Sequence, residues 1–237
     1  MLKKDYWKEA AKQFSDLRML AVAAVFIALR VAVKPLQLPL AAGLNLAFDC
    51  YVNSVGAMIY GPLVSLAVGA ISDTLGCLLF PSGAYFFPFI FIEMASGFIF
   101  SLFFWRKKIT VSRTILAKFT VNFICNIIMT SLVMKWDYYV FYGLEKAQAY
   151  SLINLTRIAK NLITFPIEAI IIFVILFAAM PALSRIKVID KQYLPDRKIE
   201  AKHIILVIVL LLISVALILF YIFFLKDFVS AHNFKLL

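Results

Sequence analysis

The sequence has little charge for its length. Charged residues make up 16% of its 237 positions and hydrophobic residues 64%, whereas a soluble domain is about half apolar and about a quarter charged. This composition excludes a soluble globular, disordered or fibrous protein. Cysteine is also scarce, and Cys50, Cys77 and Cys125 lie far apart inside apolar segments. We expect buried, unreactive thiols rather than a disulfide framework.

The motifs of bond-making chemistry are missing as well. The sequence contains no phosphate-binding Gly-rich loop with Lys, no His-Glu-x-x-His motif, no paired cysteines and no Ser nucleophile elbow. We therefore predict that the chain is not an enzyme and has no catalytic residue, cofactor or metal site. A function driven by ATP would need a separate ATPase subunit.

Long apolar runs dominate what is present. A spanning helix needs about 20 residues, and the apolar stretches lie at 17–33, 44–60, 63–80, 87–105, 116–134, 156–179 and 203–225. Gly61-Pro62 separates the second stretch from the third, and polar or basic breaks lie at 135–155 and 184–202. This pattern predicts an all-α, multi-pass membrane protein.

Basic residues orient this bundle. The N-terminal tail, the connection after the fourth stretch and the connection after the sixth hold five, five and six Lys or Arg residues, which makes sixteen of the 24. The positive-inside rule places these three segments, and therefore the N-terminus, in the cytoplasm. The spacing of Trp7, Ala10 and Phe14 in the tail fits either a short interfacial helix or an extension of the first span.

Polar side chains at membrane depth are costly unless they face the bundle interior. Arg30 and Lys34 lie at the outer end of the first span, and Arg157 and Lys160 at that of the sixth. Together they predict a basic, outward-facing vestibule for a ligand with an anionic outer end. Snorkelling to the interface is an alternative for Arg30 and Lys34. For Arg157 and Lys160 the alternative is internal ion pairing with Asp73 and Glu168.

Asparagines and aromatic residues complete the candidate site. Asn122 and Asn126 share one face of the fifth span, and either offer hydrogen bonds to a heterocycle or join helices. Asn161 lies on the polar face of the sixth span. The loop after the third span carries further candidates that either cover a flat ligand or form an interfacial aromatic belt; these are Phe80, Tyr85 and Phe87.

Small residues form a stripe on the first span. Ala24 and Ala28 lie four positions apart, so their side chains share one helix face. Such a stripe allows close approach of another helix. From spacing alone, contact with a partner protein and packing inside the bundle are equally good explanations.

Taken together, these motifs resemble a known family. The matching segments are Ala24-x-x-x-Ala28 with Arg30, residues 45–48 leading to 56–62, residues 69–76 leading to 79–88, residues 157–161 and residues 165–168. Over about residues 16–185 they look like the S component, the substrate-binding membrane subunit, of an energy-coupling factor (ECF) vitamin transporter, which is an ABC transporter. The folate-specific member is the most similar.

The resemblance implies a six-helix bundle in the plasma membrane that captures vitamin from outside. An S component docks on a membrane coupling subunit joined to two ATPases, and the stripe that includes Ala24 and Ala28 contacts the coupling subunit. In this interpretation Arg30, Arg157 and Lys160 hold anionic or polar ligand groups. Asn122 and Asn126, with Asn161 beside them, bind the pterin edge, and the three aromatic candidates stack on or cover the ring.

Two features depart from the family pattern. Residues 203–225 form a seventh apolar stretch, and Asp49 stands where an uncharged residue is expected. We therefore divide the chain into an N-terminal segment at 1–16, a six-helix binding domain at 17–185, and a basic linker with a seventh transmembrane helix at 186–237. The rival hypotheses are an S component for another vitamin, such as riboflavin or thiamin, and a membrane scaffold that binds no ligand.

Overall fold

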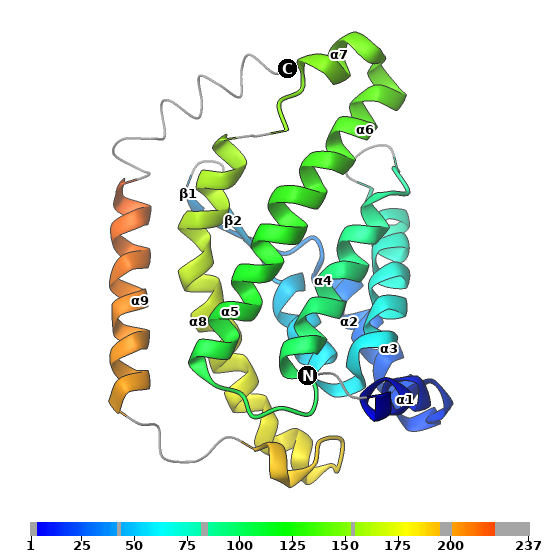
Figure 1. Cartoon of the computed structure of the whole chain (residues 1–237), viewed down its shortest axis with the longest axis vertical. Helices are drawn as coiled ribbons and strands as arrows, with labels where there is room; N and C mark the ends of the chain where they lie inside the picture. Colours follow the sequence, from blue (N-terminus) through cyan, green and yellow to red (C-terminus); the bar gives the residue numbers. More distant parts are fainter. Residues whose placement is uncertain (1–3, 42–43, 82–84, 153–154, 195–200, 221–237) are drawn as a thin grey trace.

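The computed structural model describes residues 4–41, 44–81, 85–152, 155–194 and 201–220. These residues are nearly all helical (Figure 1). The elements are α1 (Lys4–Lys12), the 3-10 turn η1 (Gln13–Ser15), α2 (Leu17–Val33), β1 (Gln37–Ala41), β2 (Leu44–Ala47), α3 (Asp49–Leu79), α4 (Phe89–Phe104), α5 (Val111–Val121), the π-helix η2 (Asn122–Met129), α6 (Thr130–Tyr142), α7 (Leu144–Ala149), α8 (Leu155–Arg185), the 3-10 turn η3 (Lys191–Tyr193) and α9 (Ala201–Phe220).

Helix α3 is two arms joined at a reversal. Gly61 has a φ of 80°, outside the helical range, and Pro62 begins the second arm. An added Cβ on Gly97 of α4 would lie within 3.2 Å of both Ser65 and Asn53. In a straight helix residues 53 and 65 would be about 18 Å apart, so the chain must fold back between them. The predicted break at Gly61-Pro62 is confirmed.

Three helices are long and apolar enough to cross a membrane by length and composition in the part of the chain that the structure describes. They are Asp49–Leu79 (whose length is the sum of the two arms that meet at Gly61), Val111–Tyr142 and Arg157–Arg185. Helix α4 and residues Ile205–Leu217 within α9 are shorter apolar helices. The prediction of a helical, multi-pass membrane protein is confirmed in this form.

The expected second span begins later than predicted, because residues 44–47 are not helical. Strands β1 and β2 form an antiparallel hairpin that pairs Leu38 with Leu46. Pro39 belongs to this edge strand, where a residue that lacks a backbone N–H is tolerated. Leu46 is buried. The alternation of leucine with other residues from Leu36 to Leu46 is the signal that an all-helical prediction overlooked.

The fifth span is longer than predicted. Helices α5, η2 and α6 run on from Val111 to Tyr142, whereas the sequence predicted a break from residue 135. No Gly or Pro interrupts this stretch, and it ends at Gly143, which has a φ of 87°. The aromatic and polar residues at 135–142 are therefore part of a helix that projects beside the rest of the bundle (Figure 1).

Helix α1 is a separate element under one end of the bundle (Figure 1). Asp16 has extended backbone angles and caps α2 by accepting a hydrogen bond from the backbone N–H of Arg18. The Tyr6 ring packs edge-on against Trp105, with ring centres 4.9 Å apart, and Glu9 pairs with Arg106. The chain before α2 is thus not a continuation of the first span.

Candidate functional site

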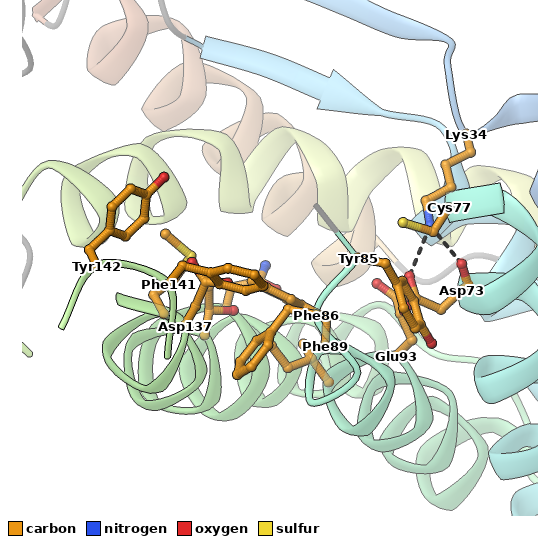
Figure 2. A pocket seen from close by; sticks show the side chains of 14 residues that line it. Lys34, Asp73, Cys77, Tyr85, Phe86, Phe89, Glu93, Asp137, Phe141 and Tyr142 are labelled. Carbon is orange, nitrogen blue, oxygen red and sulfur yellow. Dashed lines mark hydrogen bonds and ion pairs between the residues drawn. The ribbon is translucent and has the colours of Figure 1, made fainter. Parts of the chain in front are cut away.

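A cavity of about 700 Å³ lies between α3, α4, η2 and α6, under the loop at 85–88. Figure 2 shows the side chains that line it. The Lys, Arg, Asp and Glu residues among the described lining residues are Lys34, Asp73, Glu93 and Asp137. One base and three acids give this cavity a more acidic lining than the basic vestibule that the sequence predicted.

Lys34 is paired with an acid at one end of the cavity. Its Nζ lies 2.9 Å from Asp73 Oδ1, as the dashed lines in Figure 2 show. The Lys34 chain crosses α3 directly over Gly76, where an added Cβ would lie 2.5 Å from Lys34 Cδ. The absence of a side chain at Gly76 lets Lys34 reach Asp73. Internal ion pairing, rather than snorkelling, is what the structure shows for Lys34.

Arg30 is clamped behind the same end of the cavity. Its Nε and Nη2 donate to the two oxygens of Asp49 at 2.8 Å each, and Nη2 also donates to Glu93 Oε2 at 2.6 Å. The Arg30 side chain is only 2% exposed, so it does not snorkel. Asp49, the charge that departed from the family pattern, is its bidentate partner. Arg30 reaches the cavity through Glu93, which lines it.

The aromatic wall differs in part from the predicted set. Tyr85 lines the cavity, and its hydroxyl lies 3.4 Å from Thr74 Oγ1. Phe80 and Phe87 are 45% and 58% exposed and are not among the described residues that line the cavity. Phe86, which the sequence analysis did not select, packs edge-on against Trp136 and Phe141 across the cavity. The order of aromatic residues along a loop does not reveal which of their rings faces the cavity.

The three predicted asparagines come together. The Asn126 amide donates to the side-chain oxygens of Asn122 and Asn161 at 3.1 and 3.0 Å, and the Asn122 amide donates to the Asn161 carbonyl at 3.3 Å. Asn126 also lines the cavity. These bonds join η2 to α8, and a π-helix at such a point often marks a functional site. Both predicted roles, helix joining and ligand contact, therefore remain open for Asn126.

Arg157, a predicted ligand residue, is not among the described residues that line the cavity. Its guanidinium donates to Ser131 Oγ at 2.8 Å and to the Tyr150 hydroxyl at 2.9 Å. The Tyr150 ring packs on Tyr138, and Tyr138 packs on Tyr142, a lining residue. Arg157 is thus connected to the Tyr142 end by a row of tyrosines.

Lys160 and Glu168 of α8 have surroundings that differ from those predicted. Lys160 is half-buried and is not among the described lining residues. Glu168 pairs with Lys118 at 3.1 Å, and Lys118 is almost fully buried. Lys118 is one of the five basic residues that the sequence analysis assigned to the cytoplasmic connection after the fourth stretch. Helix α5, however, begins at Val111 and carries this lysine into the bundle. Its acidic partner lies 50 positions further along the chain, beyond the reach of a helical pattern.

The alanine stripe faces outward. Ala24 and Ala28 are both exposed on α2, whereas Ala23 and Arg30 are buried. In the described structure these two side chains therefore lie on the surface and do not pack inside the bundle.

Comparison with known proteins places this geometry in a family. The family model described as "ECF transporter, substrate-specific component" matches residues 18–176. The chain belongs to this family. It is a substrate-binding subunit of a transporter, as the resemblance of its motifs implied. The match covers the described elements from α2 to most of α8 and excludes α9.

Individual relatives of this substrate-specific component are folate transporters by name. The chain is 30% identical over 148 residues to "Folate transporter FolT" of Clostridium novyi (strain NT), which covers 62% of the chain and 79% of the relative. It is also 30% identical over 154 residues to the protein of the same name from Leuconostoc mesenteroides subsp. mesenteroides, and this alignment covers 65% of the chain and 81% of the relative. A solved structure, "Crystal structure of FolT bound with folic acid", is similar with a TM-score of 0.55 and 29% identity, over 66% of this chain and 90% of the other.

Proposed function

We propose that this substrate-specific component captures folate or a reduced folate from outside the cell. The observation that carries the proposal is a cavity of about 700 Å³, within the usual size range of small-molecule sites, in a chain about 30% identical to two named folate transporters. Aromatic rings and an asparagine line the cavity together with charged groups. These are suitable neighbours for a flat heterocycle with polar edges.

The test is direct identification of the ligand. Protein purified in mild detergent is denatured, and the released small molecules are analysed by mass spectrometry and pterin absorbance; calorimetry with folic acid follows on ligand-free protein. We expect a pterin and saturable binding. Release of a flavin or of thiamin would instead assign the component to another vitamin, and the absence of any saturable vitamin binding would favour the scaffold hypothesis.

The proposed site has two ends. We assign Arg157 and Lys160 to the carboxylate-bearing end of the ligand, because Arg157 connects through tyrosines to the Tyr142 end. Asn126 and Tyr85 would touch the ring, with Asn122 and Asn161 holding Asn126 in place. Arg30 would act through Glu93. Phe80 and Phe87 would cover the ring only after the loop has rearranged, because both are exposed.

The proposal extends to the membrane and to partners. We place the N-terminus, the connection between α4 and α5, and the connection at 184–202 in the cytoplasm. The spans would be α2, the two arms of α3, α4, the α5–α6 helix and α8, and Lys118 would belong to the α5–α6 span rather than to the predicted connection at 106–118. Helix α9, which packs beside α8 (Figure 1), would be a seventh span of the plasma membrane. Its predicted end at 221–225 lies outside the described residues. The exposed face with Ala24 and Ala28 would dock on the coupling subunit, which would carry two ATPases.

A further inference from the structure

The cavity has a distinct acidic end. Asp73 and Glu93 both line it, one on the second arm of α3 and the other near the start of α4. Figure 2 shows both carboxylates near Tyr85, with the third lining acid, Asp137, beside Phe141 and toward Tyr142 at the other end. A ligand carboxylate needs a basic partner, but at this end Lys34 already binds Asp73 and Arg30 already binds Glu93. Arg157 is connected instead to the Tyr142 end.

Charges at the acidic end do not balance. The Lys34–Asp73 pair is neutral. Arg30 has two carboxylate partners, Asp49 and Glu93, so this group carries one negative charge in excess. An excess charge that is partly removed from water is costly unless hydrogen-bond donors compensate for it. A ligand that presents N–H donors would supply this compensation.

Glu93 is the carboxylate best placed to receive such donors. Arg30 holds its Oε2 at 2.6 Å, and the Glu93 side chain is still 32% exposed at the cavity wall. Asp73, by comparison, is 12% exposed and holds Lys34. Arg30 itself is fixed by the bidentate contact with Asp49. The Glu93 carboxylate is therefore oriented in advance, which reduces the cost of ordering it when a ligand binds.

We propose that Glu93, positioned by Arg30, recognises the donor edge of the ligand's heterocycle, namely an amino group beside a ring N–H, and sets the specificity of the cavity. This inference rests on the proposed function. The 2-amino-4-oxo ring of a folate presents this pair of donors, which one carboxylate accepts in parallel. The carboxylate tail of the ligand then extends toward Tyr142 and the tyrosines that connect it to Arg157. That end also has one acid, Asp137 (Figure 2), but it lies away from the group formed by Asp49, Asp73 and Glu93.

Calorimetry on the full chain in detergent tests the proposal with two probes. The first is folic acid and the second is the analogue in which a methyl group replaces the 2-amino group. On the wild-type protein we expect the analogue to bind at least about tenfold more weakly, because a carboxylate loses a charge-assisted hydrogen bond. This measurement needs no variant, so it does not depend on how a substitution affects folding.

Glu93→Gln completes the cycle. We expect it to weaken folic acid binding at least about tenfold and to reduce the discrimination between the two probes, since both changes remove the same interaction. The matched control is Glu145→Gln, the same chemical change on the exposed helix α7, which should keep both affinities.

The outcomes separate the two hypotheses. A wild-type protein that binds no folic acid refutes the proposed function, and this inference falls with it. A wild-type protein that binds both probes equally refutes the inference and leaves the proposed function standing. Tighter binding of folic acid by Glu93→Gln would also refute it, because relief of repulsion would place the carboxylate tail at the acidic end.

Discussion

At the scale of single residues, ion pairing decides what each cation does. Arg30, in the last turn of α2, and Lys34, the residue that caps its C-terminal end, are four positions apart, yet they bind different acids from α3 and α4. The sequence identified both as exceptional at membrane depth, but periodicity along one helix does not reveal the residues that face it from another helix. Arg30 is buried with Asp49 and Glu93, and leaving such a group with one partner fewer costs several kcal/mol, about 3–5 for a broken buried pair.

Gly76→Ala should lower both stability and ligand affinity. The new Cβ would lie 2.5 Å from Lys34 Cδ, so Lys34 would have to leave its position over α3 and lose contact with Asp73. We expect a loss of about 1–3 kcal/mol in the free energy of unfolding, measured by thermal denaturation in detergent. In a Lys34→Ala background the same substitution should cost much less. An equal cost in both backgrounds would show that Gly76 does not act through Lys34.

Arg157→Ala should weaken folate binding through the tail of the ligand. Loss of a charge-assisted hydrogen bond to a carboxylate corresponds to about 10–150-fold in affinity. Pteroic acid, which lacks the glutamate carboxylates, should lose much less affinity in calorimetry on the same variant. A parallel loss for folic acid and pteroic acid would mean that Arg157 only supports the fold through Ser131 and Tyr150. Lys160→Ala is tested in the same way.

At the scale of elements, α2 has a buried face and an exposed face, and we assign a different role to each. Arg30 on the buried face reaches the wall of the cavity through Glu93, whereas Ala24 and Ala28 lie on the exposed face. Small side chains let helix backbones approach closely. One helix is therefore positioned to connect a ligand site with a partner surface. Helical spacing predicted that the alanines share a face, and burial in the folded chain determined that this face is the outer one.

Ala24→Trp and Ala28→Trp should separate binding from transport. The indole would block close approach of the coupling subunit but leave the cavity unchanged, so we expect near-normal folate affinity with loss of ATP-dependent uptake and of complex formation. Val174→Trp, at an exposed position of α8, is the control with equal bulk and should retain uptake. A joint fall of expression, binding and uptake in the alanine variants would contradict a docking role.

At the scale of the whole molecule, the charge asymmetry predicts orientation. The connection between α4 and α5 and the described residues 186–194 after α8 lie at the end of the bundle that carries α1, and α7 lies at the opposite end (Figure 1). The positive-inside rule makes the α1 end cytoplasmic. The cavity, which reaches Tyr142 at the end of α6, then opens toward the outside.

Cysteine labelling in intact cells tests this orientation. In a background without the three native cysteines, Ser112→Cys and Gln192→Cys should resist a membrane-impermeant thiol reagent, whereas Glu145→Cys on α7 should react. Permeabilised cells, in which all three sites should react, are the control. Labelling of Ser112→Cys in intact cells would reverse the orientation of the bundle.

The sequence by itself determined the membrane class, the reversal at Gly61-Pro62 and the family, because composition, a helix-breaking pair and local motifs are properties of neighbouring residues. The hairpin at 37–47 was also within its reach and was overlooked. Tertiary structure alone decided that Arg30 binds Asp49 and Glu93, that Lys118 binds Glu168, and that Phe86 rather than Phe87 faces the cavity. These partners lie 19 to 63 positions apart along the chain. A periodic pattern indicates which face of a helix is buried, but the acid that meets a buried cation is set by how several helices pack together.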